Sequence, residues 1–259
     1  MNHLSNIQNL LKNTISVSDN RCPACKRKFM LKDGEEYCFH CTEIAPEDNK
    51  VSEEVGVWIA NREVDELATA FKKKSLMNKD LEEATLSSYL PQNETQKQAL
   101  KAAYEYVDSF DKVHGMFLQG RPGIGKSHLA ASIVKELIQK KHTGIFISLP
   151  RLMTELKATY DKNSDLKEAD LLAALQKVDL LVMDDLGVER NGKGQATAWA
   201  QSKIYEIVDS RIGKATIYTT NFSANELLDM YGERDFSRMV QDCTSVKMAG
   251  ENYRFRNFK

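Results

Sequence analysis

Long apolar stretches are absent from this chain of 259 residues. No apolar run approaches the roughly 18 residues that a membrane-spanning helix needs. The N-terminus, MNHLSNIQNLLKNTISVSDN, lacks both the charged start and the apolar centre of a secretory signal. A net charge of only −1 excludes a general electrostatic attraction to nucleic acid and leaves local patches for any DNA contact. These absences predict a cytoplasmic protein with no membrane partner.

Cysteine is scarce, but four of the five cysteines form two pairs. Cys22-Pro-Ala-Cys25 and Cys38-Phe-His-Cys41 are C-x-x-C motifs separated by twelve residues. In a cytoplasmic chain this spacing predicts a tetrahedral Zn²⁺ site, and a shell closed by four thiolates predicts a structural role. The alternatives are two redox motifs, unrelated cysteines, or His40 as a ligand in place of one cysteine.

Glycine is also sparse, with 13 residues, yet three glycines fall within the segment GRPGIGKS at 120–127. This segment fits the phosphate-binding loop G-x-x-x-x-G-K-[S/T], in which glycines let backbone N–H groups approach phosphate oxygens. Lys126 is expected to neutralise the β- and γ-phosphates, and Ser127 to bind Mg²⁺. The alternative is a glycine-rich turn without a ligand. The expected nucleotide contacts in the loop are Gly120, Arg121, Pro122, Gly123, Ile124, Gly125, Lys126, Ser127 and His128.

Short apolar segments alternate with amphipathic helical segments from about residue 113 onward, which predicts an α/β fold. The expected elements are strands at 115–120, 144–149, 178–185, 215–221 and 244–248, a helix from Lys126, a helix after Asn93 as its cap, and a helix at 53–74. Strands of this kind form a parallel five-stranded sheet sandwiched by helices. Ligands bind such sheets at the carboxyl ends of the strands, where the phosphate-binding loop leaves the first strand.

Two acidic residues end the apolar run VDLLVMDDLG. In the Walker B arrangement, Asp184 holds Mg²⁺ and Asp185 orients or deprotonates the attacking water. The alternative is an acidic pair that merely closes a buried strand. Asn221 ends the run IYTTN, where an amide can reach the γ-phosphate, although asparagine at this place is also a common turn residue.

A base-reading Asn-Lys-x-Asp motif is absent after residue 187, so the sequence favours ATP over GTP. The segments FLQGRPGIGKSHLAASI, VDLLVMDDLG, IYTTN and GERDFSRM occur in the order found in AAA+ ATPases. Together they resemble the replicative helicase loaders of the DnaC/DnaI type, bacterial or phage, and the transposition helpers of the IstB type share this core. The resemblance covers about residues 76–259. It implies an AAA+ fold without a C-terminal helical lid, since only 11 residues follow the last expected strand.

The resemblance also implies roles for individual residues. Asn221 matches the sensor I residue, and Arg254 matches the sensor II arginine, which contacts the nucleotide. Arg238 matches the arginine finger, which acts on ATP bound by a neighbouring subunit, with Arg234 as the second choice. From the sequence alone these two arginines are equally well surface charges. The implied catalytic set is Lys126, Asp185, Asn221 and Arg238.

Three parts are expected: a zinc-binding module at 1–45, a helical linker with the start of the ATPase region at 46–110, and an AAA+ ATPase domain at 111–259. The resemblance implies an ATPase that uses ATP and Mg²⁺, assembles as an ATP-dependent homo-oligomer, and loads a hexameric replicative DNA helicase onto single-stranded DNA during replication initiation. The alternatives are an IstB-like transposition helper that binds duplex DNA and a transposase, and a zinc adaptor that does not hydrolyse its nucleotide.

Overall fold

The computed structural model describes residues 16–32, 34–52, 79–161, 167–188 and 197–258. The chain divides into two compact units, Met1–Arg62 and Glu63–Lys259. The helix expected at 53–74 lies outside the described residues, and the division into three parts stays a prediction. Among the described residues, no helix is both long enough and apolar enough to cross a membrane.

The first unit is built on a small antiparallel sheet of order β1-β2-β3. Its elements are the strands β1 (Ser16–Arg21), β2 (Lys28–Lys32) and β3 (Glu35–Tyr37), followed by a π-helical turn η1 (His40–Ile44) and further helix at 45–52. Within the described part of this unit, only Ser18, Cys22 and Cys38 are buried. This described part therefore lacks an apolar core, and two of its three buried residues belong to the C-x-x-C pairs.

The second unit contains a five-stranded sheet of order β5-β6-β7-β4-β8, in which every pair of neighbours is parallel. This confirms the predicted α/β sheet and all five expected strands. The strands are β4 (Gly115–Gly120), β5 (Gly144–Ser148), β6 (Leu180–Leu186), β7 (Thr216–Thr220) and β8 (Cys243–Met248). The helices are α3 (Lys79–Glu82), α4 (Glu94–Asp108), α5 (Lys126–Gln139), α6 (Leu149–Ala158), α7 (Glu168–Lys177), α8 (Ala198–Ser210) and α9 (Ala224–Val240), with a 3₁₀ helix η2 (Tyr253–Phe258).

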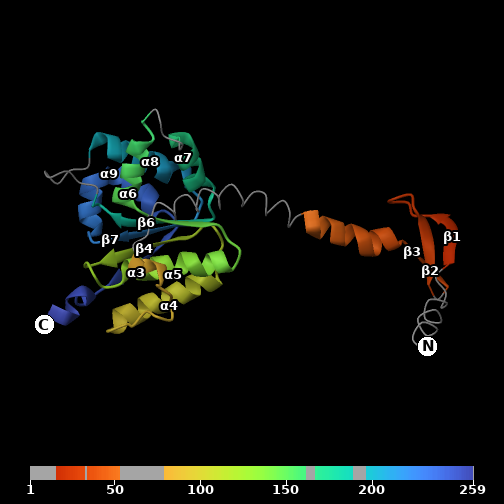
Figure 1. Ribbon diagram of the computed structural model, residues 1–259, viewed down its shortest axis with the longest axis horizontal. Helices are drawn as coiled ribbons and strands as arrows, with labels where there is room; N and C mark the ends of the chain where they lie inside the picture. Colours follow the sequence, from red (N-terminus) through yellow and green to blue (C-terminus); the bar gives the residue numbers. More distant parts are fainter. Residues whose placement is uncertain (1–15, 33, 53–78, 162–166, 189–196, 259) are drawn as a thin grey trace. The chain divides into compact units, whose positions relative to one another are not determined.

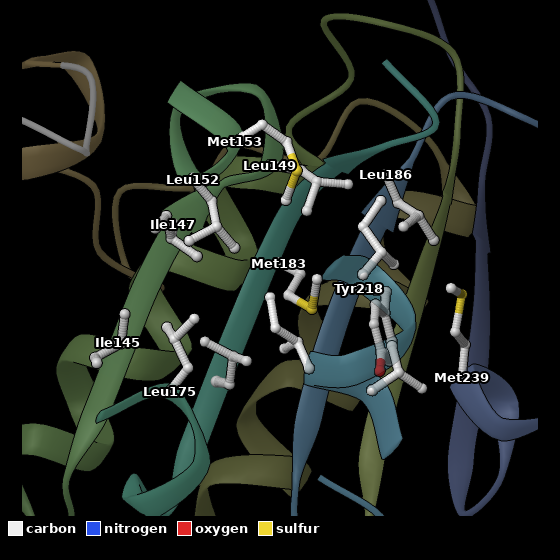
Figure 2. Packing of buried hydrophobic residues seen from close by; sticks show 14 of the residues in the cluster. Ile145, Ile147, Leu149, Leu152, Met153, Leu175, Met183, Leu186, Tyr218 and Met239 are labelled. Atoms are coloured by element: carbon white, nitrogen blue, oxygen red, sulfur yellow. The ribbon is translucent and has the colours of Figure 1, made fainter. Parts of the chain in front are cut away.

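Helices cover both faces of this sheet (Figure 1), and an apolar layer lies between the helices and the sheet on each face. Helices α3, α4 and α5 pack on one face, and α6 to α9 pack on the other. Strand β6 shows the alternation directly, because Leu181 and Met183 join the layer on the α6–α9 face while Leu180 and Val182 join the opposite layer. Figure 2 shows side chains of the α6–α9 layer meeting between the strands and the helices. Burial on both faces explains why β4, β5 and β6 are mostly apolar, whereas the edge strand β8 is partly exposed and more polar.

Local signals set the helix starts as expected. Asn93 is the N-cap of α4, and its side chain accepts a hydrogen bond from the backbone N–H of Gln96. Ser223 caps α9 in a reciprocal arrangement with Glu226. These caps position two helices that border the carboxyl edge of the sheet.

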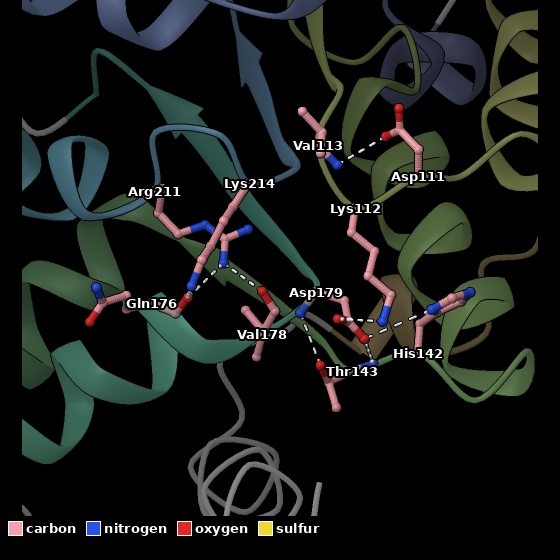
Figure 3. Close-up of polar contacts among 10 residues, drawn as sticks. All are labelled: Asp111, Lys112, Val113, His142, Thr143, Gln176, Val178, Asp179, Arg211 and Lys214. Atoms are coloured by element: carbon pink, nitrogen blue, oxygen red, sulfur yellow. Dashed lines mark hydrogen bonds and ion pairs between the residues drawn. The ribbon is translucent and has the colours of Figure 1, made fainter. Parts of the chain in front are cut away.

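A buried arginine closes the C-terminus of α7 (Figure 3). Arg211 is 3% exposed, and its Nη1 donates to the backbone oxygens of Leu175, Gln176 and Val178 at 3.2, 3.2 and 2.6 Å. These carbonyls have no partner within the helix, so the guanidinium supplies hydrogen bonds that the last turn lacks. Burial lowers the pKa of Arg211 to about 10, so it remains charged at neutral pH.

Replacing Arg211 with methionine keeps much of its volume but removes its hydrogen bonds to the buried oxygens of Leu175 and Val178. We expect Arg211→Met to lower the free energy of unfolding by about 2–4 kcal/mol, measured by urea denaturation. Lys214→Met is the matched control, because exposed Lys214 also donates to the Gln176 oxygen, at 2.9 Å. The control should lose less than about 0.5 kcal/mol. Equal losses would contradict the capping role.

Candidate functional site

The glycines of the 120–127 segment adopt backbone conformations that other residues avoid. Gly120, Gly123 and Gly125 have φ values of +156°, +75° and +95°. A Cβ atom on Gly120 would lie 2.2 Å from the backbone oxygen of Met248 on the neighbouring strand. Gly125 is the N-cap of α5 and has no side chain to cover the first N–H groups of the helix. The segment therefore joins β4 to an open helix N-terminus, which is the arrangement that binds phosphate.

Lys126 points into this loop and is 4% exposed. Its Nζ donates to the backbone oxygens of Gly120 and Arg121, both at 2.9 Å, and to Oδ1 of Asn221 at 2.7 Å. Burial lowers the pKa of Lys126 to about 8, and the carboxylates of Asp184 and Asp185 oppose that shift. The structure thus brings Asn221, from the end of β7, to the lysine of the loop.

The acidic pair lies at an irregularity between β6 and β7, where the strand register shifts between Met183 and Leu186. Asp185 has a left-handed backbone with φ of +63°. Asp184 is 4% exposed, and burial, followed by the charge of Asp185, raises its pKa to about 6. Hydrogen bonds from Thr219 and Ser127 oppose this rise. The Ser127 hydroxyl and the Asp184 carboxylate form a set of hard oxygen donors that fits Mg²⁺.

Thr219 is a site residue that the sequence analysis missed. Its Oγ1 donates to Oδ1 of Asp184 at 2.6 Å and accepts the backbone N–H of Asp185 at 3.0 Å. One hydroxyl therefore holds both members of the acidic pair. The available signal was polar residues at the end of a fully buried strand, TIYTT, where apolar residues would otherwise be expected.

The predicted arginine finger is not brought to the loop of its own chain. Arg238 stands near the end of α9 and lines a small cavity with Gly115, the first residue of β4. The phosphate-binding loop leaves the other end of β4. Since β4 has six residues, its two ends lie about 17 Å apart. Arg238 Nη1 binds Asp209 Oδ1 at 2.5 Å and the Tyr205 hydroxyl, and the guanidinium of Arg234 lies 4.6 Å from the centre of the Tyr205 ring.

Two other predicted nucleotide contacts lie beside the loop. His128, the third residue of α5, donates from Nε2 to the backbone oxygen of Thr85 at 2.9 Å. Arg254 is exposed, yet its charge is close enough to contribute to the lowered pKa of Lys126. The structure therefore places Arg254 near the phosphate-binding loop and turns His128 toward the segment before α4.

The C-terminal segment runs along the loop. The backbone N–H of Tyr253 donates to the Gly123 oxygen at 2.8 Å. A cavity of about 390 Å³ lies between the loop and this segment, which is a size that small ligands occupy. Its lining residues are Arg121, Pro122, Gly250, Glu251, Asn252 and Phe255.

The four paired cysteines meet in the first unit. Their sulfur atoms all lie within 4.8 Å of one another, with Cys22–Cys41 at 3.8 Å and Cys25–Cys38 at 3.4 Å. A tetrahedral Zn²⁺ with Zn–S bonds of about 2.3 Å requires sulfur separations of about 3.8 Å, so the cluster fits this ion. All five cysteines of the chain are free thiols, and His40 is not part of the group.

Charges within the cluster also favour a cation. The backbone N–H groups of Cys25 and Ala24 lower the pKa of Cys22 to about 7. Hydrogen bonding with Cys25 and Cys38 instead raises the pKa of Cys41 to about 12. Four adjacent sulfurs do not all ionise without a positive ion between them, and a bound metal removes that repulsion.

Fold and site together define a class of protein. A parallel sheet of order β5-β6-β7-β4-β8 carries a phosphate-binding loop, an acidic pair and a polar strand-end residue at the carboxyl ends of three adjacent strands. This is a P-loop ATPase domain of the AAA+ type. The chain belongs to the family of IstB-like ATP binding proteins, whose sequence profile matches residues 48–259.

Several sequence relatives of this chain are helicase loaders. The replicative helicase loader DnaC of Escherichia coli K12 is 35% identical over 158 residues, which are 60% of this chain and 62% of that protein. This chain therefore spans less than two thirds of that relative. The crystal structure of the DnaC helicase loader is 29% identical, with a TM-score of 0.59, and covers 66% of this chain and 100% of that one. The crystal structure of DnaI, 24% identical, shares the fold with a TM-score of 0.56 over 68% of this chain and 93% of that one.

Removing the Thr219 hydroxyl should weaken the magnesium site. We expect Thr219→Val to raise the Mg²⁺ concentration needed for half-maximal nucleotide binding about tenfold, because Asp184 loses the partner that orients it. Thr220→Val is the control: Thr220 is equally buried, but its hydroxyl donates to the Leu186 oxygen at 2.8 Å. Titration of a fluorescent ATP analogue with Mg²⁺ measures the effect. The same rise in both variants would contradict the role of Thr219.

Metal removal should act on one unit alone. We expect about one zinc per chain by elemental analysis, and loss of ordered structure at residues 16–52 on chelation, because the described residues of that unit form no apolar core. Hydrogen exchange should show the strands of the second unit still protected. Cys25→Ser should lose the zinc, whereas Cys243→Ser, outside the cluster, should retain it. Retention of zinc by Cys25→Ser would contradict the four-cysteine site.

Proposed function

We propose that this protein is an ATP-dependent loader that places a hexameric replicative DNA helicase onto single-stranded DNA during replication initiation. The observation that carries the proposal is the convergence of Lys126, Ser127, Asp184 and Asn221 at one edge of the sheet, in a chain whose relatives are helicase loaders. The same family supports hydrolysis of ATP to ADP and phosphate.

The residues of the loop account for binding. Lys126 neutralises the β- and γ-phosphates, while the N–H groups of the loop and of the start of α5 donate to phosphate oxygens. Ser127 and Asp184 would hold Mg²⁺, which when bound neutralises phosphate charge. Asp185 orients the attacking water and accepts its proton. Arg254, near Lys126, is the further cationic contact.

The lysine also couples the nucleotide to β7. The Lys126 ammonium has three N–H donors, and all three are engaged by the oxygens of Gly120, Arg121 and Asn221. A phosphate oxygen therefore gains a hydrogen bond from Lys126 only by replacing one of these acceptors. Displacement of Asn221 would transmit the presence of a γ-phosphate to the strand end that precedes α9.

Hydrolysis would require a second subunit. Arg238 stands at the opposite end of β4 from its own loop, so it would contact only the ATP of a neighbour. Such an arginine typically contributes ~10³–10⁵ in rate, and an isolated subunit would hydrolyse slowly. ATP-dependent self-assembly follows, because ATP then lies between the loop of one subunit and Arg238 of the next.

We propose three parts: a zinc module at 1–45, a linker at 46–110 and the ATPase domain at 111–259. The zinc module is the part proposed to contact the helicase. Tyr253 and Phe255 are exposed and flank Arg254, an arrangement that suits stacking and phosphate contact with single-stranded DNA. An IstB-like role with duplex DNA and a transposase is not favoured, because the relative DnaC, 35% identical over 158 residues, is a helicase loader. A zinc adaptor without hydrolysis would leave the acidic pair unused.

A mixing experiment tests ATP-dependent loading and the shared site together. Lys126→Ala and Arg238→Ala should each fail to load a hexameric helicase onto circular single-stranded DNA, with loading measured as helicase retained on the DNA. Lys126→Ala keeps the finger and Arg238→Ala keeps the loop, so their mixture should form some complete sites and recover part of the activity. Arg234→Ala should load normally if Arg238 is the finger.

Three results would refute the proposal in different ways. Normal loading by Lys126→Ala would show that helicase loading does not depend on ATP bound at this loop. If both variants are folded but their mixture recovers no loading, the result would contradict an ATP site shared between subunits. Absence of any helicase retention by the wild-type protein, alongside capture of a transposase, would assign the transposition role.

A further inference from the structure

We infer that Tyr89 is a positioning residue for the phosphate-binding loop, one that holds the Ile124–Gly125 peptide group in the orientation that binds a nucleotide. This inference rests on the proposed nucleotide site. Tyr89 stands 35 residues before Ile124, in the segment TLSSYL that precedes α4, and no motif in the sequence marks it.

Tyr89 touches the loop through both its hydroxyl and its ring. Its Oη donates to the backbone oxygen of Ile124 at 2.9 Å. A Cβ atom on Gly125 would lie 2.3 Å from Cε2 of the ring, so the ring packs directly on this glycine. Tyr89 is 7% exposed, and burial raises its pKa to about 12, so the hydroxyl keeps its proton at neutral pH.

The contact sets the direction of backbone N–H groups. In a trans peptide the C=O and the following N–H point in opposite directions, and the described chain has no cis peptide bonds. Tyr89 holds the Ile124 oxygen, so the N–H of Gly125 faces away from Tyr89. The backbone N–H of Tyr253 donates to the Gly123 oxygen at 2.8 Å, so the N–H of Ile124 faces away from Tyr253. Two successive N–H groups are thereby oriented, as an anion-binding loop requires.

The segment that carries Tyr89 is itself anchored. Leu86 is fully buried in the apolar layer formed with α4 and α5. His128, from the start of α5, donates to the Thr85 oxygen at 2.9 Å, and its ring centroid lies 5.4 Å from that of Tyr89. Tyr89 is therefore held against the same helix whose N-terminus the loop forms. His128 therefore supports Tyr89, and its contact with the nucleotide stays a prediction.

A conservative pair of variants tests the inference. Tyr89→Phe removes the hydroxyl and keeps the ring, while Tyr106→Phe is the control. Tyr106 also donates to a backbone oxygen, that of His114 at 2.8 Å, next to the start of β4 and away from the loop. The full-length proteins are compared for binding of Mg²⁺ with ATP, for displacement of a fluorescent ATP analogue by inorganic tripolyphosphate, and for melting temperature without ligand.

Tyr89→Phe should bind ATP and tripolyphosphate more weakly by the same factor, between about twofold and about tenfold, since one hydrogen bond that orders the loop is lost. Tyr106→Phe should bind both as the wild type does, even where its melting temperature falls as much as that of Tyr89→Phe.

Other results would overturn the inference. Unchanged binding by Tyr89→Phe would show that the hydroxyl does not order the loop. A loss for ATP but not for tripolyphosphate would make Tyr89 a contact of the nucleoside instead. An equal loss of binding in Tyr106→Phe would show that the weaker binding comes from lower overall stability and not from the loop. Absence of ATP binding by the wild type would instead refute the proposed nucleotide site itself.

Discussion

The parallel direction of all five strands is the constraint on which the second unit depends. It places the carboxyl ends of β4, β6 and β7 side by side, so the loop, the acidic pair and Asn221 meet without any long excursion of the chain. The sheet holds this arrangement because apolar layers cover both faces. Polar groups are then concentrated where the strands end, and there they are tied to one another, as by Lys126 with Asn221 and by Thr219 with Asp184.

The first unit follows a different physical rule. Its described strands bury almost nothing apolar, and its cysteines converge from two separate turns. We therefore expect its stability to depend on the availability of a metal, while that of the second unit depends on packing. One chain thus joins two units whose folding responds to different conditions.

Much of the second unit could be predicted because the signals were local. Apolar runs predicted the strands, Asn93 predicted the start of α4, and the glycine spacing of GRPGIGKS predicted the loop. The cysteine cluster was equally readable, because its ligands come in two pairs.

Contacts between distant elements could not be predicted in the same way. Tyr89 reaches the loop from a segment without a motif, Arg211 binds the end of a helix more than 30 residues earlier, and Arg238 binds Tyr205 and Asp209 on another helix. Each depends on how two elements pack, and a single sequence carries no periodic signal for that. The site assignments that rest on family resemblance, above all Arg238 and Arg254, remain predictions.

The interruption of α9 at Gly232 has a mechanical consequence. Gly232 has φ of +79° within the helix, and apart from its neighbours along the chain no described atom lies within 4 Å of where its Cβ would be. An unbroken helix would carry a movement at Asn221 undiminished to Arg238, whereas a helix with a joint at Gly232 does not. Arg238 is held by its own neighbours, Tyr205 and Asp209. In the proposed assembly, each subunit would therefore present the same guanidinium to the adjoining subunit throughout its own turnover cycle.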